Sequence, residues 1–231
     1  MSRALRVGGL VPLTTLDYPG RLACVLFCQG CAWRCRYCHN PQLIAPRGAG
    51  ERSWDEILAF LQRRQGLLEA VVFSGGEPTL QESLPAAMAQ VRQMGFKVGL
   101  HSAGIKPEAL ARALPQADWV GFDVKSLAED CQAITGVRGS GAANWRSLEY
   151  LLASGVEHEC RTTVHWHLID LPRLMTLGRR LQAQGVRRFV VQLVRTTQML
   201  DADLPLAMPQ AALGELWAGL GALFADFELR S

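Results

Sequence analysis

The sequence predicts a single α/β domain in which helices cover a mostly parallel sheet. Short apolar runs alternate with amphipathic segments, and no linker-like stretch or internal repeat divides the chain. Strands that are apolar almost throughout are typical of parallel sheets, because both faces of such sheets are covered. Since helical crossovers are right-handed, the chain builds either a doubly wound sheet or an incomplete α/β barrel.

Six strand–helix units are predicted in chain order. The strands are apolar runs, expected at 22–28, 70–76, 97–104, 118–126, 157–166 and 187–195. The helices show the 3.6-residue apolar period, expected at 53–64, 81–95, 107–115, 144–155, 171–185 and 209–225. We assign residues 1–20 to an N-terminal segment, 21–195 to the six units and 196–231 to a C-terminal helical segment of one domain.

Local signals support the helix boundaries. Ser53, with Glu56 three residues later, is typical of a capping box at a helix start. Pro85 falls within the first turn of its helix, and Gly95 ends that helix. The glycine-rich stretch 135–144 separates two units, and its composition predicts a mobile loop.

Composition places the chain among ordinary globular proteins. Its 231 residues bury a sizeable core without disulfides or a metal, and 49% of them are hydrophobic. A net charge of +3 with scattered basic residues gives no reason to expect a nucleic-acid partner. Because no signal peptide or membrane-spanning run is visible, we predict a cytoplasmic protein without a membrane partner. The seven cysteines are then expected as thiols or ligands rather than disulfides.

Polar residues fall where the predicted strands end. In both architectures ligands bind beyond the carboxyl ends of the strands, so these side chains are expected to share one site. In chain order the candidates are Cys31, Cys35, Cys38, Ser74, Gly75, Gly76, Glu77, His101, Ser102, Asp123, Lys125, Arg161 and Gln192.

The stretch GCAWRCRYCHNP holds three cysteines with the spacing C-x3-C-x2-C, and Cys28 precedes it. Structural zinc sites usually join two C-x2-C pairs through a longer loop, whereas only three residues separate Cys31 from Cys35. A [4Fe–4S] cluster bound by three thiolates keeps one iron open for another ligand. The spacing favours the cluster, while zinc and simple unligated thiols remain alternatives.

Together with Tyr37 before the last cysteine and GGEP at 75–78, this stretch resembles the radical S-adenosylmethionine (SAM) superfamily. The longer string LDYPGRLACVLFCQGCAWRCRYCHNP resembles its glycyl-radical-enzyme activases, in particular the long-form activating proteins of anaerobic ribonucleoside-triphosphate reductase. The resemblance extends from residue 8 to residue 164. It implies an incomplete (β/α)6 barrel of the TIM type.

The resemblance implies that Cys31, Cys35 and Cys38 ligate a [4Fe–4S] cluster whose open iron binds SAM through its amino and carboxylate groups. An electron from a low-potential donor such as flavodoxin or ferredoxin would cleave SAM to methionine and a 5′-deoxyadenosyl radical. That radical would take a hydrogen atom from a glycine of a partner enzyme, and the implied partner is anaerobic ribonucleoside-triphosphate reductase.

The resemblance also implies contacts to SAM. Gly75, Gly76 and Glu77 would hold the methionyl amino group, and Arg161 would meet the methionyl carboxylate through its guanidinium fork. The other implied contacts are Tyr37 at the adenine, Ser102 and Asp123 at the ribose, and Lys125 at a carboxylate. Structural alternatives exist for each: a strand-to-helix turn, an edge-strand arginine, a cap, and an ion pair at a strand end.

Several residues outside the SAM contacts also carry expectations. Asp17 matches an acidic residue that contacts the substrate loop in related activases, although an Asx turn explains it equally well. His101 stands where related activases carry an aspartate that, in some of them, helps bind a monovalent cation, so the resemblance does not extend to that cation site. Trp33 is expected to shield the cluster, and His39 to support a turn. The cysteines without a ligand role, expected as buried thiols, are Cys24, Cys28, Cys131 and Cys160.

Three functions of different kinds are compatible with these motifs. The first is activation of a glycyl-radical enzyme, either the reductase or another such as pyruvate formate-lyase. The second is a radical SAM enzyme that modifies a small molecule, for example in deazapurine synthesis. The third is a non-catalytic electron-transfer or zinc-binding module, which predicts four ligating cysteines with Cys28 among them.

Overall fold

The structure, a computed structural model, describes residues 4–195, 199–205 and 213–230. Its strands form one sheet of eight in the order β1 to β8. Strand β1 is antiparallel to β2, and every other neighbouring pair is parallel. The strands are β1 (Val7–Thr14), β2 (Ala23–Cys28), β3 (Ala70–Gly75), β4 (Lys97–Ser102), β5 (Trp119–Asp123), β6 (Glu157–Val164), β7 (Arg188–Leu193) and β8 (Asp226–Arg230).

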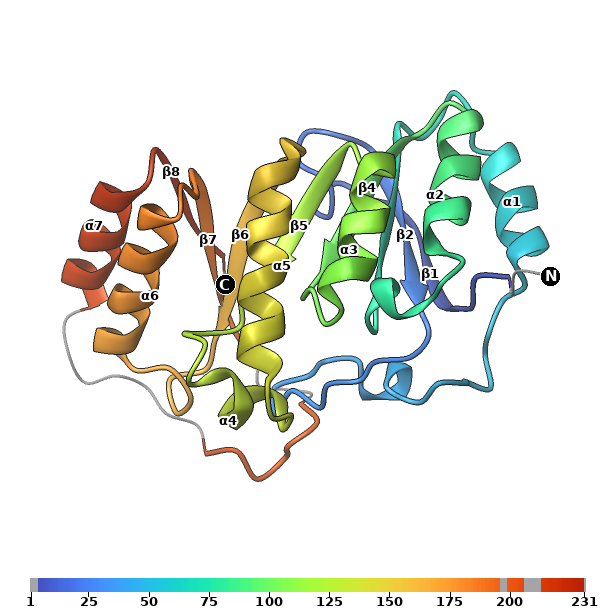
Figure 1. Cartoon of the computed structure of the whole chain (residues 1–231). Helices are drawn as coiled ribbons and strands as arrows, with labels where there is room; N and C mark the ends of the chain where they lie inside the picture. The colour runs from blue at the N-terminus through green and yellow to red at the C-terminus, as the bar shows by residue number, and fades with distance from the viewer. Residues whose placement is uncertain (1–3, 196–198, 206–212, 231) are drawn as a thin grey trace.

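Helices cover one face of this sheet, and the short helix α4 lies beyond one end of it, beside the cysteine loop (Figure 1). The α-helices are α1 (Trp54–Gln62), α2 (Leu84–Gln93), α3 (Pro107–Ala113), α4 (Cys131–Thr135), α5 (Ser140–Ser154), α6 (Leu171–Ala183) and α7 (Leu213–Leu223). Three 3-10 turns occur at η1 (Pro41–Leu43), η2 (Pro78–Leu80) and η3 (Leu114–Gln116).

Both faces of the central strands are buried, which explains why they are apolar throughout. Along β2, Cys24 and Leu26 join the large core between the sheet and the helices. Ala23 and Val25 alternate with them and face a smaller apolar cluster on the opposite side, which includes Trp119. The predicted α/β domain is confirmed, as a mostly parallel sheet that does not close on itself.

The prediction of six strands missed the two outer ones. Strand β1 lies in the predicted N-terminal segment, and its sequence VGGLVPLT contains two glycines and a proline. Strand β8 lies in the predicted C-terminal helical segment, and three of its five residues, DFELR, are charged. Such compositions are poor strand signals, because these strands are specified by pairing with β2 and β7 rather than by their own propensity.

The prediction of a loop over 135–144 is wrong for the second half of that range, because helix α5 begins at Ser140. Gly139 has a φ of 80° and turns the chain into the helix. Gly141 is packed so closely on the Ala128 carbonyl that any added Cβ would overlap it. The glycines therefore serve tight packing at a helix start. The predicted helix over 209–225 is found as α7, and its expected first residues lie outside the described ranges.

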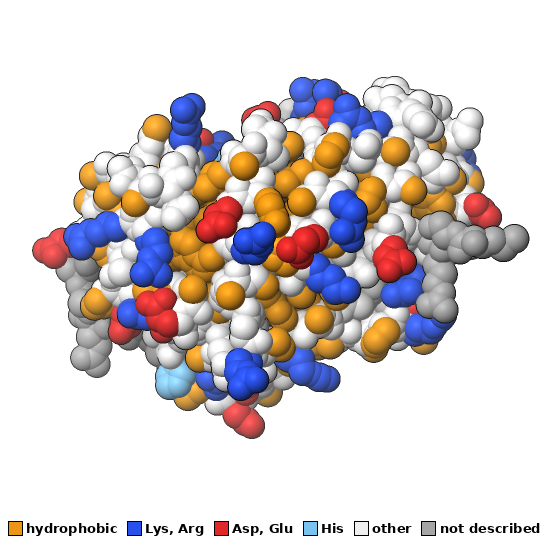
Figure 2. All heavy atoms as spheres, viewed as in Figure 1, with side chains coloured by type: hydrophobic (Ala, Val, Ile, Leu, Met, Phe, Trp, Pro, Cys, Tyr) orange, Lys and Arg blue, Asp and Glu red, His pale blue; other side chains and the backbone are white. Residues whose placement is uncertain are grey.

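On the helix-covered face, basic and acidic side chains are interspersed with apolar patches (Figure 2). This mixture agrees with the small net charge of +3. Across the described ranges, no helix combines the length and the apolar composition that crossing a membrane requires.

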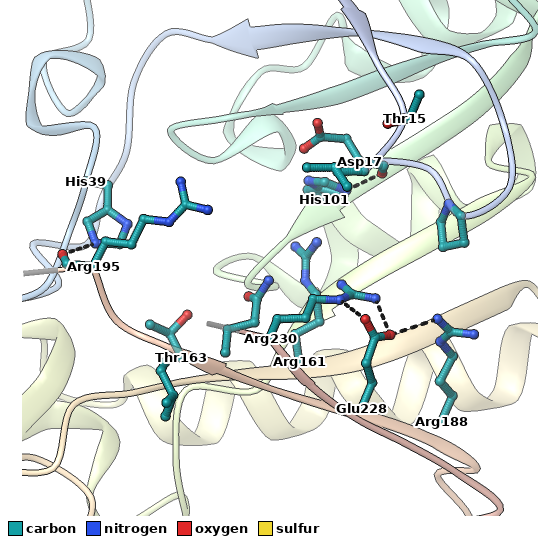
Figure 3. Close-up of a pocket in the computed structure, with 14 residues that line it drawn as sticks. Thr15, Asp17, His39, His101, Arg161, Thr163, Arg188, Arg195, Glu228 and Arg230 are labelled. Carbon is teal, nitrogen blue, oxygen red and sulfur yellow. Dashed lines mark hydrogen bonds and ion pairs between the residues drawn. The ribbon is translucent and has the colours of Figure 1, made fainter.

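A buried ion-pair network fixes β8 to the sheet. Glu159 on β6, whose side chain is only 1% exposed, accepts hydrogen bonds from Arg188 of β7 at 3.1 Å and from Arg230 of β8 at 2.8 Å. Glu228 pairs with the same two arginines, at 3.3 and 2.7 Å (Figure 3). Because Glu159 is fully desolvated, its removal leaves two guanidinium groups without their buried partner.

We expect Glu159→Gln to lower the free energy of unfolding by about 2 kcal/mol, because the buried charge that holds both arginines is lost. Urea unfolding followed by circular dichroism measures this change. Glu149→Gln, an exposed position on α5, is the control and is expected to change stability by less than about 0.5 kcal/mol. Equal effects of the two substitutions would contradict the role of the network.

Candidate functional site

The site begins where β2 and β3 end side by side. The Gly76 amide donates to the Cys28 carbonyl at 2.9 Å, and the Glu77 amide donates to the Gly30 carbonyl at 2.9 Å. A Cβ on Gly75, whose φ is 109°, would lie 2.5 Å from the Cys28 nitrogen, and one on Gly76 would overlap the Gly30 carbonyl. The two glycines thus let the turn after β3 pack directly on the start of the cysteine loop.

The cysteine loop is held by backbone hydrogen bonds from both sides. Cys31 donates its amide to the Ile44 carbonyl at 3.1 Å. Arg34 and Arg36 donate theirs to the carbonyls of Thr135 and Ile134 in α4, both at 3.0 Å. These contacts explain why α4 lies at this end of the sheet, beside the loop that it supports.

The structure separates the cysteines as the sequence predicts. Cys31, Cys35 and Cys38 are partly exposed and line one cavity of about 190 Å³, which we call the inner cavity. The four other cysteines are buried, and none of them lines this cavity: Cys24, Cys28, Cys131 and Cys160. Within the described ranges, no three His, Cys, Asp or Glu side chains are grouped as ligands of a single metal ion.

The other predicted site residues meet the cysteines in the inner cavity. Its wall includes Trp33, Tyr37, His39, Asn40, Ser74, Gly75, Gly76, Glu77, His101, Ser102, Asp123, Lys125 and Arg161. Asp17 and Gln192 are absent from this lining and belong to a second cavity described below. The carboxyl ends of β2 to β6 therefore converge on one site, as the topology predicts.

Glu77 is buried and its carboxylate is already engaged. Oε1 accepts from the Thr79 hydroxyl at 2.6 Å and from the Ser102 hydroxyl at 2.7 Å, and Oε2 accepts from the Ala103 amide at 2.9 Å. Burial raises the pKa of Glu77, and these hydrogen bonds oppose that shift. Glu77 and Ser102 therefore join the turn after β3 to the end of β4, which shapes the cavity wall.

Asp123 lies between two cations. Its Oδ1 pairs with Arg161 at 2.9 Å, and its Oδ2 pairs with Lys125 at 3.2 Å. Burial alone would raise the pKa of Asp123, but Lys125 and Arg161 outweigh it and hold the pKa well below its usual range. Lys125 also lies 5.8 Å from the centre of the Tyr37 ring, a cation–π distance. Lys125 and Arg161 therefore share one carboxylate between them.

Tyr37 contributes a buried group without a protein partner. Its side chain is 4% exposed, and its hydroxyl forms no hydrogen bond within the described residues. Burial raises the pKa of this phenol, so the hydroxyl keeps its proton. Tyr37 is thus a wall residue that also packs into the core of the protein.

Sequence reasoning missed Asn144, the fully buried fifth residue of α5. Its Nδ2 donates to the carbonyls of Ala103 at 2.8 Å and Asp123 at 2.9 Å, and its Oδ1 accepts from the Lys125 amide at 3.1 Å. This side chain ties the ends of β4 and β5 together. The sequence analysis placed Asn144 where the glycine-rich stretch 135–144 meets the predicted helix 144–155, and it assigned the residue no role.

Gln29 was also missed, and its side chain joins the start of the cysteine loop to the segment that follows the loop. It is 2% exposed, and its Nε2 donates to the carbonyls of Ala45 at 2.7 Å and Gln42 at 3.2 Å. A Cβ at Gly48 would lie 2.7 Å from its Oε1. A glutamine between Cys28 and the cysteine triad carries no distinct sequence signal, because its partners are all backbone carbonyls.

A larger outer cavity of about 780 Å³ adjoins the inner one, and Figure 3 shows its lining. His39, His101, Arg161 and Thr163 line both cavities. The segment Thr15–Pro19 borders the outer cavity on one side. The residues that border it on β7 and β8 and the segment that follows β7 are Arg188, Gln192, Leu193, Arg195, Glu228 and Arg230.

Asp17 lines this outer cavity, away from the cysteines. Its carboxylate accepts a hydrogen bond from the Thr14 hydroxyl at 2.6 Å, and the Leu16 amide donates to the same hydroxyl at 3.1 Å. The segment thus has internal hydrogen bonds of the kind that the turn interpretation anticipates.

With this geometry in place, the comparisons define the class of protein. Residues 25–170, more than half of the chain, match the sequence model of the Radical SAM superfamily. The chain therefore belongs to the radical SAM superfamily, whose enzymes use a [4Fe–4S] cluster and SAM.

Among curated proteins, the chain is 31% identical over 167 residues to "Putative glycyl-radical enzyme activating enzyme MJ1227" of Methanocaldococcus jannaschii, covering 68% of this chain and 67% of that protein. It is 32% identical over 137 residues to the pyruvate formate-lyase-activating enzyme of Clostridium pasteurianum, covering 57% of each. It is 26% identical over 202 residues to the S-adenosylmethionine-dependent nucleotide dehydratase of a Thermoplasmatales archaeon. This match covers 87% of this chain and 68% of that protein.

Solved structures support the fold. SuiB of Streptococcus suis, bound to the precursor peptide SuiA, matches with a TM-score of 0.68 at 14% identity, over 88% of this chain and 47% of that one. A domain of the pyruvate-formate lyase-activating enzyme of Bacteroides vulgatus matches with a TM-score of 0.56 at 14% identity, over 70% and 99%. At these identities the likeness extends to the fold alone.

The residues present fit a [4Fe–4S] cluster. Three thiols line one cavity, and thiolates are the ligands that iron–sulfur clusters take. Burial raises the pKa of Cys31 to about 12, so thiolate formation there requires a bound cation. The expectation of a cluster and SAM as cofactors is confirmed at the level of the superfamily.

Cys28→Ala is expected to leave the iron content after anaerobic reconstitution at about four per chain, because this buried thiol does not line the inner cavity. Cys35→Ala, the matched substitution inside the cavity, is expected to lose most of the iron. Iron and sulfide analysis with the visible absorption of the cluster measures both. Loss of iron in both variants alike would instead support a site of four cysteines.

Asp123→Asn is expected to weaken SAM binding by about tenfold, because Lys125 and Arg161 lose the carboxylate that positions them. Equilibrium dialysis of the reconstituted protein measures the affinity. Asp118→Asn is the control, since Asp118 precedes β5 at the opposite end and also pairs with a lysine, Lys97, at 3.0 Å. An unchanged affinity in Asp123→Asn, or an equal loss in the control, would refute this assignment.

Proposed function

We propose that this protein activates a glycyl-radical enzyme through reductive cleavage of SAM. One observation carries the proposal: the inner cavity, lined by the cysteine triad, adjoins a much larger outer cavity, and His101 and Arg161 stand in the wall of both. A ligand beside the cysteines and a polypeptide loop thus have adjoining spaces that meet at these residues. Two of the curated relatives described above carry activating-enzyme names, which supports this choice.

Cys31, Cys35 and Cys38 would hold the cluster, and three ligands keep one iron open for SAM. When bound, the reduced cluster supplies the electron that cleaves SAM to methionine and a 5′-deoxyadenosyl radical. The backbone of Gly75 and Gly76 lies against the cysteine loop and lines the same cavity, so it would contact a ligand bound beside the cysteines.

The charged residues of the inner cavity suit the methionyl end of SAM. Lys125 and Arg161 share the single carboxylate of Asp123, which leaves both cations able to bind a ligand carboxylate as well. The other carboxylate in the wall belongs to Glu77, which is engaged in the hydrogen bonds given above. Asp123 and Ser102 would be polar partners for the ribose, and Tyr37 would lie beside the adenine.

The outer cavity suits a polypeptide better than a compact hydrophobic ligand. Its lining combines the acids Asp17 and Glu228 with arginines, and a glycine-containing loop presents mainly backbone N–H and C=O groups. The Asp17 carboxylate at the rim accepts hydrogen bonds from backbone amides of the kind such a loop offers.

Within this proposal, anaerobic ribonucleoside-triphosphate reductase is the preferred partner. The support is the combination of DYPG at 17–20 with CHNP at 38–41, which resembles the long-form activating proteins of that enzyme. A low-potential donor such as flavodoxin or ferredoxin would deliver the electron, and the cytoplasm remains the predicted location.

A second candidate is a radical SAM enzyme that acts on a nucleotide. The nucleotide dehydratase named above aligns over 87% of this chain. Four arginines line the outer cavity, namely Arg161, Arg188, Arg195 and Arg230, and guanidinium groups suit phosphate. Three of them, however, already pair with carboxylates of the protein, so the activase remains the preferred function.

The reconstituted protein, mixed anaerobically with SAM, dithionite and the large subunit of the reductase, is expected to produce a glycyl-radical doublet in electron paramagnetic resonance. Cys35→Ala is the control and is expected to give none. If no doublet appears with the reductase or with pyruvate formate-lyase while 5′-deoxyadenosine still forms, the activase proposal fails. Consumption of a nucleoside triphosphate under the same conditions would then favour the second candidate.

A further inference from the structure

His101, the fifth residue of β4, occupies the boundary between the two cavities. It is 9% exposed and lines both of them. Gly121 on β5 makes room for it, because a Cβ there would lie 3.0 Å from the His101 ring and 2.8 Å from the Arg161 guanidinium. Figure 3 shows the ring directed toward Asp17, across the rim of the outer cavity.

Both ring nitrogens of His101 are engaged. Nε2 lies 2.9 Å from the backbone carbonyl of Asp17, and Nδ1 lies 3.3 Å from the Ser74 hydroxyl. Because a carbonyl only accepts, Nε2 must carry a proton, and Nδ1 of a neutral ring then accepts from Ser74. Burial, reinforced by the nearby Arg161, lowers the pKa of His101 to about 3, so the ring is neutral.

The two partners of His101 belong to the two sides of the site. Ser74 directly precedes the Gly75–Gly76 turn, which packs on the cysteine loop. Asp17 belongs to the segment Thr15–Pro19, which borders the outer cavity. The imidazole is therefore a hydrogen-bonded bridge from the cysteine side of the site to the segment that faces the proposed substrate.

A ring cluster beneath the bridge strengthens it. Tyr18, the residue after Asp17, packs on Trp119 with ring centroids 5.3 Å apart, and His101 meets Trp119 edge-on at 5.7 Å. A Cβ at Gly99 would lie 3.0 Å from the Tyr18 ring, so the glycine allows the ring to pack directly on the backbone of β4. Leu16, one residue before Asp17, is 81% exposed, so the anchoring begins at Asp17.

We propose that His101 is a positioning residue that couples the two cavities, holding the segment Thr15–Pro19 in register with the Gly75–Gly76 turn. The coupling itself follows from the contacts of the free protein. Its consequence rests on the proposed function: a fixed Asp17 places the partner's glycine where the radical is made. Loss of the bridge leaves SAM cleavage intact and makes it unproductive.

Two substitutions separate the two hydrogen bonds. The amide nitrogen of glutamine reaches about as far as Nε2 of histidine, so His101→Gln keeps the donor to the Asp17 carbonyl. The shorter asparagine reaches about as far as Nδ1, so His101→Asn keeps a partner for Ser74 and loses Asp17. His158→Asn is the control, because the His158 side chain bonds the Val156 carbonyl at the opposite end of the sheet.

Hydrogen–deuterium exchange of the full chain, without a partner enzyme, reads the coupling directly. In His101→Asn the peptide that covers residues 15–22, which contains the Arg21 amide bonded to the Tyr18 carbonyl and the Leu22 amide bonded to Glu69, is expected to exchange about fivefold to tenfold faster, which is the effect of losing one hydrogen bond. His101→Gln and His158→Asn are expected to exchange as the original protein does. Unchanged exchange in His101→Asn would overturn the proposal, and thermal melting of each variant separates a local effect from global unfolding.

A second readout uses the reconstituted enzyme with its partner. The number of glycyl radicals formed per 5′-deoxyadenosine is expected to fall several-fold in His101→Asn and to recover in His101→Gln, while the KM for SAM stays unchanged. A parallel fall of both products would show that His101 merely supports SAM binding, which contradicts the coupling. If the exchange result holds but the original protein forms no glycyl radical on any partner, the proposed function fails and the coupling stands.

Discussion

Direct packing of one backbone turn on another is the constraint on which the site depends. After β3, the Gly76 amide donates to the Cys28 carbonyl and the Glu77 amide to the Gly30 carbonyl, and no side chain fits at Gly75 or Gly76 between the two segments. This contact aligns the end of β3 with the start of the cysteine loop. Every further element of the inner cavity is placed relative to that junction, first through Glu77 to β4 and then through Asn144 to β5.

The polar side chains of the inner cavity are largely engaged with one another. Glu77 accepts hydrogen bonds from Ser102 and Ala103 at the end of β4 and from Thr79, Asp123 pairs with two cations, and Asn144 fixes three backbone groups. Such engagement restricts rotamers before any ligand arrives, so little reorganisation is needed on binding. Lys125 and Arg161 share a single carboxylate, so they are the groups with capacity for a further anionic partner.

Features that depend on local sequence signals could be predicted, whereas features that depend on contacts between distant segments could not. Buried parallel strands and the cysteine spacing carry strong local signals, so the α/β fold, the superfamily and the convergence of the site residues could be predicted. Strands β1 and β8 could not, because β1 is rich in glycine and β8 in charge, and both depend on partners distant in sequence. Asn144 and Gln29 were missed for the same reason, since their partners are backbone groups that only the fold brings together.

His101 shows how a departure from a family pattern gains meaning from structure. The sequence identified it only as a residue in place of an expected aspartate, whereas the fold gives it two partners on opposite sides of the site. An anaerobic crystal structure of the reconstituted protein with SAM tests the central claim most directly. We expect the cluster on Cys31, Cys35 and Cys38, with the SAM carboxylate beside Lys125 or Arg161. A cluster that also engages Cys28, or SAM bound outside the inner cavity, would contradict it.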